Sequence, residues 1–170
     1  MLSACKEKKQ SEDIITTRYV PQHLEGPIAM AADSEMVNIT WLNKPYTVRI
    51  IRTPMDSVQV SDDSGQKYVD NRVSMTIIRQ DGSTFLDKMF TKKSFLSYIQ
   101  EPFVKSGILA GIRFDEVDGS KLKFSVVVSM PDAVDDLFLP LIMAIDGDGG
   151  MSIRKDDDMG MLDYEEGDEE

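Results

Sequence analysis

The chain has 170 residues, of which 41% are hydrophobic and 29% are charged, so it has the composition of a globular protein with room for one domain. Its 30 acidic and 19 basic residues give a net charge of −11, which disfavours nucleic acid as a partner because the phosphates would be repelled. A single cysteine excludes a disulfide within the chain, and a single histidine excludes a histidine-rich metal site. Composition therefore limits the chemistry without identifying a function.

The N-terminal residues carry the most specific motif. Leu2-Ser3-Ala4-Cys5 matches the lipobox of bacterial lipoproteins, in which a cysteine is acylated and becomes the new N-terminus. Only four residues precede Cys5, so the basic and apolar parts of a signal peptide would lie upstream of this sequence. We expect residues 1–12 to be a lipobox remnant and polar linker, with Cys5 as the lipid attachment site. The alternative is a free thiol on a frayed terminus.

Alternation of apolar and polar residues predicts antiparallel strands along residues 13–155, which we interpret as one globular domain. The clearest example is residues 121–130, where five apolar side chains alternate with mostly polar ones. Turn sequences such as Asp81-Gly82-Ser83 and Asp118-Gly119-Ser120 separate neighbouring runs. The predicted strands are 37–41, 46–52, 57–60, 73–79, 85–90, 108–114, 121–130, 139–145 and 151–154.

One segment has helical spacing instead. Thr91 is a candidate N-cap, and Phe95, Ile99 and Phe103 recur at the spacing of one helix face. Pro102 ends or kinks the first stretch, which places one packed helix near residues 92–104. The predicted fold class is α+β, predominantly antiparallel β, with a sheet of about 7–9 strands. The sheet is expected to be a meander or a partly closed barrel or sandwich.

The acidic residues indicate solvated surfaces more than metal sites. Residues 156–170 contain nine acids and no base, so we expect a disordered acidic tail; a calcium-binding or partner-binding tail is the alternative. Asp146 and Asp148 alternate like ligands of a calcium loop, but the glycine and final glutamate of such a loop are missing. They are weak metal candidates, and no cofactor is expected. Asp70 and Asn71, between two predicted strands, favour a turn over a recognition site.

Several short motifs resemble a family of Bacteroidetes lipoproteins of unknown function. A D-N pair precedes a strand at Asp70-Asn71, a D-G-S hairpin follows at 81–83, and F-T-K-x-S-F opens the helix at 90–95. The similarity covers roughly residues 35–155. It implies a lipoprotein of the cell envelope and supplies no activity and no catalytic residue.

Two functions are compatible with these features. We expect a non-enzymatic lipoprotein, anchored to the outer membrane through Cys5, that binds or assembles with an envelope protein or glycan. The alternative is an envelope hydrolase, with or without calcium, that uses paired acids such as Asp115-Glu116 or Asp135-Asp136. No nucleophile motif accompanies the single histidine, His23, so no catalytic residue is predicted. A deep cleft with two convergent carboxylates would favour the enzyme, and a flat sheet face with solvated acids would favour the binding module.

Overall fold

The computed structural model describes residues 23–131 and 137–158. Cys5, the pair Asp135-Asp136 and the acidic tail from residue 159 onward lie outside these residues. The elements, in chain order, are β1 (Asp33–Trp41), β2 (Lys44–Ser61), β3 (Lys67–Arg79), β4 (Thr84–Phe90), η1 (Lys92–Tyr98), α1 (Phe103–Ser106), β5 (Ile108–Asp118), β6 (Lys121–Ser129), β7 (Phe138–Ile145) and β8 (Met151–Lys155).

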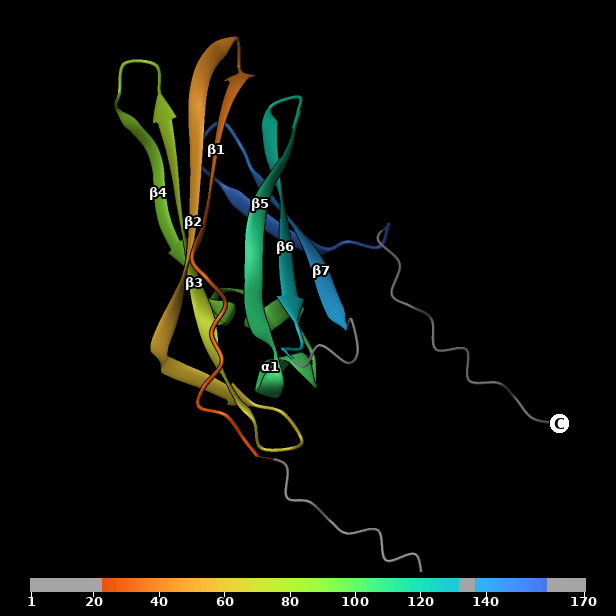
Figure 1. Cartoon of the computed structure of the whole chain (residues 1–170). Helices are drawn as coiled ribbons and strands as arrows, with labels where there is room; N and C mark the ends of the chain where they lie inside the picture. Colours follow the sequence, from red (N-terminus) through yellow and green to blue (C-terminus); the bar gives the residue numbers. More distant parts are fainter. Residues whose placement is uncertain (1–22, 132–136, 159–170) are drawn as a thin grey trace, which may run out of the picture.

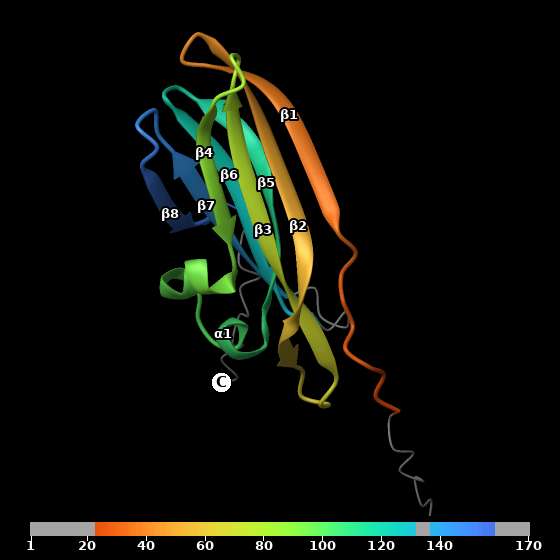
Figure 2. The ribbon, with the colours of Figure 1, turned by 90° about the vertical axis from the view of Figure 1, so that its left-hand side faces the viewer.

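The strands form two antiparallel sheets, so a single sheet of 7–9 strands is not confirmed, and of the arrangements expected the sandwich is the one observed. One sheet has the order β1-β2-β3-β4 and the other β5-β6-β7-β8, and the two face each other (Figures 1 and 2). The predicted predominance of antiparallel β structure is confirmed, and neither four-stranded sheet closes into a barrel. Two sheets bury each other's apolar faces, whereas one eight-stranded sheet would have only two short helices to cover it.

The core lies between the sheets and contains side chains from both. Val48 and Met75 of the first sheet belong to the same buried cluster as Phe124 and Leu141 of the second. The alternation predicted for residues 121–130 is confirmed in β6, whose even-numbered residues from 122 to 128 are fully buried. Trp41 is also buried, as expected for a core residue. Each large side chain removed from water contributes on the order of 1.5–3 kcal/mol.

The predicted helix near residues 92–104 is replaced by two shorter pieces. A 3₁₀ helix, η1, is followed by the four-residue helix α1, and together they connect β4 of one sheet to β5 of the other (Figure 2). At the start of η1, the Thr91 amide donates to Ser94 Oγ at 3.1 Å. Phe95, Ile99 and Phe103 are buried as the spacing predicted. Two features explain the break in the helix. The connection between the sheets buries these three side chains at the end of the core. Pro102 also lacks the amide hydrogen that a continuous helix would use.

Two strands of the first sheet are longer than predicted. β2 joins the predicted strands 46–52 and 57–60, and its register with β3 shifts between Pro54 and Gln59. β3 begins at Lys67, so Asp70 and Asn71 lie within a strand and the turn predicted there is wrong. Their side chains hydrogen-bond to the backbone of Leu109 on the opposite sheet, and these bonds stabilise the two polar residues within the strand.

Candidate functional site

A cleft of about 310 Å³ lies at one edge of the sandwich, where β1 and β2 face β5. Its volume is at the lower end of the range typical of small-ligand pockets. Four charged side chains line it: Asp33, Glu35, Arg52 and Arg113. The apolar part of its lining includes Met30, Ile50, Ile112 and Val127. We call it the β1–β5 cleft.

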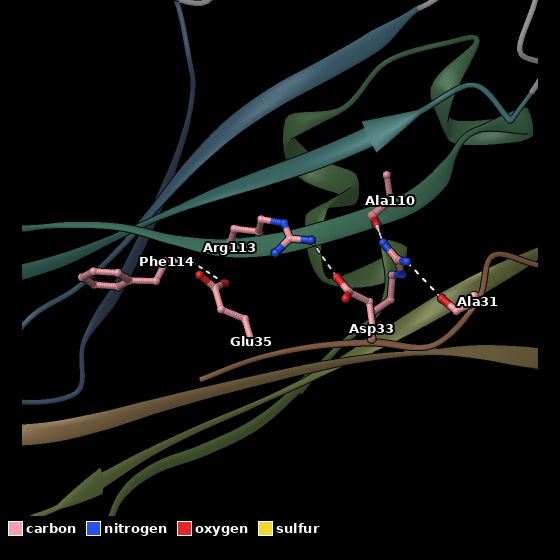
Figure 3. Close-up of polar contacts among 7 residues, drawn as sticks. Ala31, Asp33, Glu35, Ala110, Arg113 and Phe114 are labelled. Atoms are coloured by element: carbon pink, nitrogen blue, oxygen red, sulfur yellow. Dashed lines mark hydrogen bonds and ion pairs between the residues drawn. The ribbon is translucent and has the colours of Figure 1, made fainter. Parts of the chain in front are cut away.

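The alternation of β1 directs two acids into this cleft. Asp33 and Glu35 share the inward, half-buried positions of the strand with Val37 and Ile39, and the intervening residues are exposed. Inward charges on an edge strand discourage pairing with another chain. At this end of β1 the inward face meets the edge of β5 (Figure 3). The acids therefore contact polar groups of β5 instead of the apolar core.

Both acids have partners on β5. The Arg113 guanidinium donates from Nη2 to Asp33 Oδ2 at 2.6 Å, and the side chains remain 60% and 42% exposed. The Phe114 amide donates to Glu35 Oε2 at 3.3 Å (Figure 3). Exposed ion pairs typically contribute about 0–1 kcal/mol, so the Arg113–Asp33 contact orients the two groups more than it stabilises the fold.

Arg52, which lines the cleft, joins three segments of the chain. Its Nη1 donates to the Ala110 carbonyl of β5 at 2.7 Å, and its Nη2 donates to the Ala31 carbonyl at 3.0 Å. Within the described residues, no carboxylate lies at ion-pair distance from Arg52, and its buried Nε has no hydrogen-bond partner. The guanidinium is therefore held by neutral carbonyls and not by a direct ion pair.

A second polar cluster joins β3 to the start of β5. Asp70 Oδ1 accepts hydrogen bonds from the Leu109 amide at 2.8 Å and from the Asn71 amide at 2.7 Å. Asn71 Nδ2 donates to the Leu109 carbonyl at 3.0 Å. Both side chains are buried, so they are not a surface recognition site. Between Leu109 and Phe114, side chains of β1, β2 and β3 thus bind the backbone edge of β5. We call Glu35, Arg52, Asp70 and Asn71 the β5 edge latch.

Lys92 ties the connecting segment to the start of β5. Its Nζ donates to the Gly107 carbonyl at 2.7 Å. Burial lowers the pKa of the Lys92 ammonium, and the negative charges of Asp70 and Glu101 oppose that shift. The contact fixes η1 against β5, outside the β1–β5 cleft.

The weak metal candidates form a hairpin turn between β7 and β8. Asp146 Oδ1 accepts hydrogen bonds from the amides of Asp148 and Gly150 at 3.0 and 2.8 Å. In residues 23–131 and 137–158 no group of three or more histidine, cysteine, aspartate or glutamate side chains is arranged to hold a metal ion. Asp146 and Asp148 stay weak metal candidates, and calcium is the alternative to the expectation of no cofactor.

The acids proposed for a hydrolase are at the surface or outside the described residues. Lys123 Nζ lies 3.5 Å from Glu116 Oε1 and 2.7 Å from Asp118 Oδ2. The hydrogen bond from Lys123 lowers the pKa of Asp118, and the same bond raises the pKa of Lys123. Asp115 is exposed next to this ion-paired group. Asp135 and Asp136 have no described placement.

Sequence reasoning did not single out the four charged residues of the cleft. A signal for Arg52 was present, because it continues the inward series of Tyr46, Val48 and Ile50. A charged residue at a core position of a strand indicates either a buried partner or a cleft. Nothing local in the sequence brings Arg113 to Asp33, since they are 80 residues apart.

The two facing sheets and their edge cleft define a small antiparallel β-sandwich domain with a ligand-sized cleft of charged groups on apolar walls. Residues 14–153 match the family model of DUF4738, a domain of unknown function, and the chain belongs to this family. The match agrees with the expectation of an uncharacterised family. No curated protein matches the chain. In the described part of the chain, no helix is long and apolar enough to cross a bilayer.

Proposed function

We propose that this protein is a non-enzymatic binding or assembly module of the bacterial cell envelope, held at the outer membrane by an acylated Cys5. The β1–β5 cleft is the observation that carries the binding role. It has the size of a small-ligand site and presents four charged groups on largely apolar walls. We also propose that this protein is one of the Bacteroidetes lipoproteins that its short motifs resemble.

Binding is favoured over hydrolysis because the cleft acids already have protein partners. A general acid or base must reach the proton it transfers on the substrate. Asp33 is instead engaged by Arg113, and Glu35 by the Phe114 amide. Such contacts suit a preformed binding surface, so the hydrolase alternative is not the function we propose.

The anchoring role is supported by the Leu2-Ser3-Ala4-Cys5 motif and by the contacts that hold the segment before β1 on the folded domain. The Glu25 amide donates to Gln66 Oε1 at 3.1 Å, and Gln66 Nε2 donates to the Glu25 and Gly26 carbonyls at 3.3 Å. Ile28 adds a backbone bridge to β3 at Tyr68. These contacts fasten the segment before β1 to the folded domain, so a lipid on Cys5 would hold the whole sandwich. The two acyl chains of a lipoprotein cysteine are sufficient for stable anchoring.

The test is to place a basic and apolar leader upstream of Met1 and express the full chain in a Gram-negative host. The leader carries no cysteine, so Cys5 is the only acylation site. We expect the wild type to partition into detergent and to carry a diacylglyceryl group on Cys5 by mass spectrometry. Cys5→Ala should stay in the aqueous phase, and Ser3→Ala, which keeps a small residue in the lipobox, should behave as wild type. Identical partitioning of wild type and Cys5→Ala would refute the anchor.

A further inference from the structure

We propose that the β1–β5 cleft binds a small zwitterion with an apolar body, the chemistry of a free α-amino acid with an apolar side chain. This inference rests on the proposed function, because it names the ligand class of the binding module. It follows from the balance, the order and the accessibility of the charges in the cleft.

The charges lining the cleft sum to zero. Asp33 and Glu35 contribute two negative charges, and Arg52 and Arg113 contribute two positive charges. A ligand with a net charge would leave one partly desolvated charge uncompensated, which is unfavourable. A zwitterion brings one charge of each sign and keeps the balance.

The signs also alternate along the cleft. Figure 3 shows Glu35 next to Phe114, followed by Arg113 in contact with Asp33. Arg52 is the cross-strand neighbour of Asp33 and reaches Ala110 and Ala31 beyond it. Acids and arginines therefore alternate along the cleft, from Glu35 at one end to Arg52 at the other. Such a pattern is complementary to a dipolar ligand rather than to an anion or a cation.

The Arg113–Asp33 pair is the part of the cleft that a ligand can enter. One nitrogen contacts one oxygen, so Arg113 keeps further donors and Asp33 keeps Oδ1 for another partner. Both side chains are well exposed, and a solvated pair of this kind stabilises the fold by little. A ligand carboxylate can take the remaining donors of Arg113, and the ligand ammonium can bind Asp33 Oδ1.

The apolar residues that line the cleft favour a ligand with an apolar body. Ile50 and Ile112 are almost fully buried core residues that reach the cleft, and Met30 also lines it. Methionine adapts its shape readily to a ligand. With about 310 Å³ available, the cleft suits one small molecule rather than an extended chain.

Leucine and three of its derivatives separate the charge requirements. Leucine is a zwitterion, N-acetylleucine an anion, leucinamide a cation and N-acetylleucinamide neutral. Each is titrated into the full chain by calorimetry, with amide chemical shifts of Ala110 to Phe114 recorded in parallel. We expect leucine to bind at least about tenfold more tightly than each derivative and to shift these amides.

Two variants locate the site. Arg113→Gln should weaken leucine binding at least about tenfold, whereas Arg72→Gln, an exposed arginine on β3, should leave it unchanged. Gly111→Leu should also block binding, because a Cβ at Gly111 meets only Arg52 Nη1 at an ordinary 3.7 Å and the side chain would fill the cleft. Equal affinity for a singly charged derivative, or no binding by the folded wild type, would overturn the proposal. Neither result would change the detergent partitioning that tests the envelope anchor.

Discussion

At Leu109 the backbone of an edge strand is paired by side chains instead of by another strand. Asp70 accepts from its amide and Asn71 donates to its carbonyl, as a neighbouring strand would. Both side chains are buried, and Asn71 Oδ1 has no hydrogen-bond partner among the described residues. Loss of a partner from such a buried group costs more than a typical hydrogen bond contributes. Asp70 is therefore a residue whose removal should be severe.

We predict that Asp70→Ala lowers the free energy of unfolding by about 2–5 kcal/mol, because the buried amides of Leu109 and Asn71 would each lose an acceptor. Asp87→Ala provides the matched control, since Asp87 is exposed on β4. It should change stability by no more than about 0.5 kcal/mol. Urea denaturation followed by circular dichroism measures both variants. A loss under about 1 kcal/mol for Asp70→Ala would contradict the structural role assigned to it.

The 3₁₀ helix η1 has one buried and one exposed face within a single turn. Phe95 is fully buried and stacks on Phe90 with ring centroids 5.9 Å apart, whereas its neighbour Leu96 is 43% exposed. The segment therefore contributes to the core through a few inward side chains. Its stability depends on those contacts more than on helix propensity.

We predict that Phe95→Ala lowers the free energy of unfolding by about 3–5 kcal/mol, because it leaves a cavity at the end of the core. Leu96→Ala, one residue along the same helix, should cost less than about 1 kcal/mol. Thermal and urea unfolding of the two variants give the comparison. Similar losses for both would mean that η1 does not orient Phe95 as described.

Strand existence was predictable from the sequence where one face is apolar and the other polar, as in β6. The prediction failed at Asp70 and Asn71, because polar residues typical of turns are stabilised in β3 by a strand 39 residues away. The sequence left the arrangement open between a meander, a barrel and a sandwich, since alternation reports a buried face without saying what covers it. For the same reason the charged residues of the cleft did not stand out, because their meeting depends on which sheet edges face each other.

Each sheet edge of the whole molecule carries a feature that discourages pairing with another chain. β1 has its inward acids, and β5 has the edge latch and two register shifts. β4 and β8 are short, at seven and five residues, and carry Lys88 and Lys155 respectively. Recognition through the cleft or a sheet face is therefore favoured over recognition by strand addition.

We predict that acid destabilises the molecule through its turns. Hydrogen bonds from Ser64 and Ser83 lower the pKa of Asp62 and of Asp81 below the ordinary 3.8, and the hydrogen bond from Lys123 does the same for Asp118. The unfolded chain then binds more protons than the folded one as these groups titrate. Their stabilisation is present above the unfolded pKa and is lost as pH falls through the lower folded values.

Urea unfolding between about pH 5 and about pH 2 measures this loss. Asp81→Asn should flatten the pH dependence of the unfolding free energy over that range, because it removes one of the carboxyl groups whose pKa is lowered in the folded chain. A wild-type unfolding free energy that stays constant over the range would contradict the prediction.

The meander order of both sheets has a consequence for how the chain folds. Every paired strand is also the next strand in the sequence, so each sheet can grow by closing one hairpin after another. Short loops close quickly, and folding rates rise as contacts become more local. The contacts between the sheets, such as Asp70 with Leu109, need distant segments to meet. Docking of two preassembled meanders, with the segment from Thr91 to Gly107 between them, is therefore the step that should limit the folding rate.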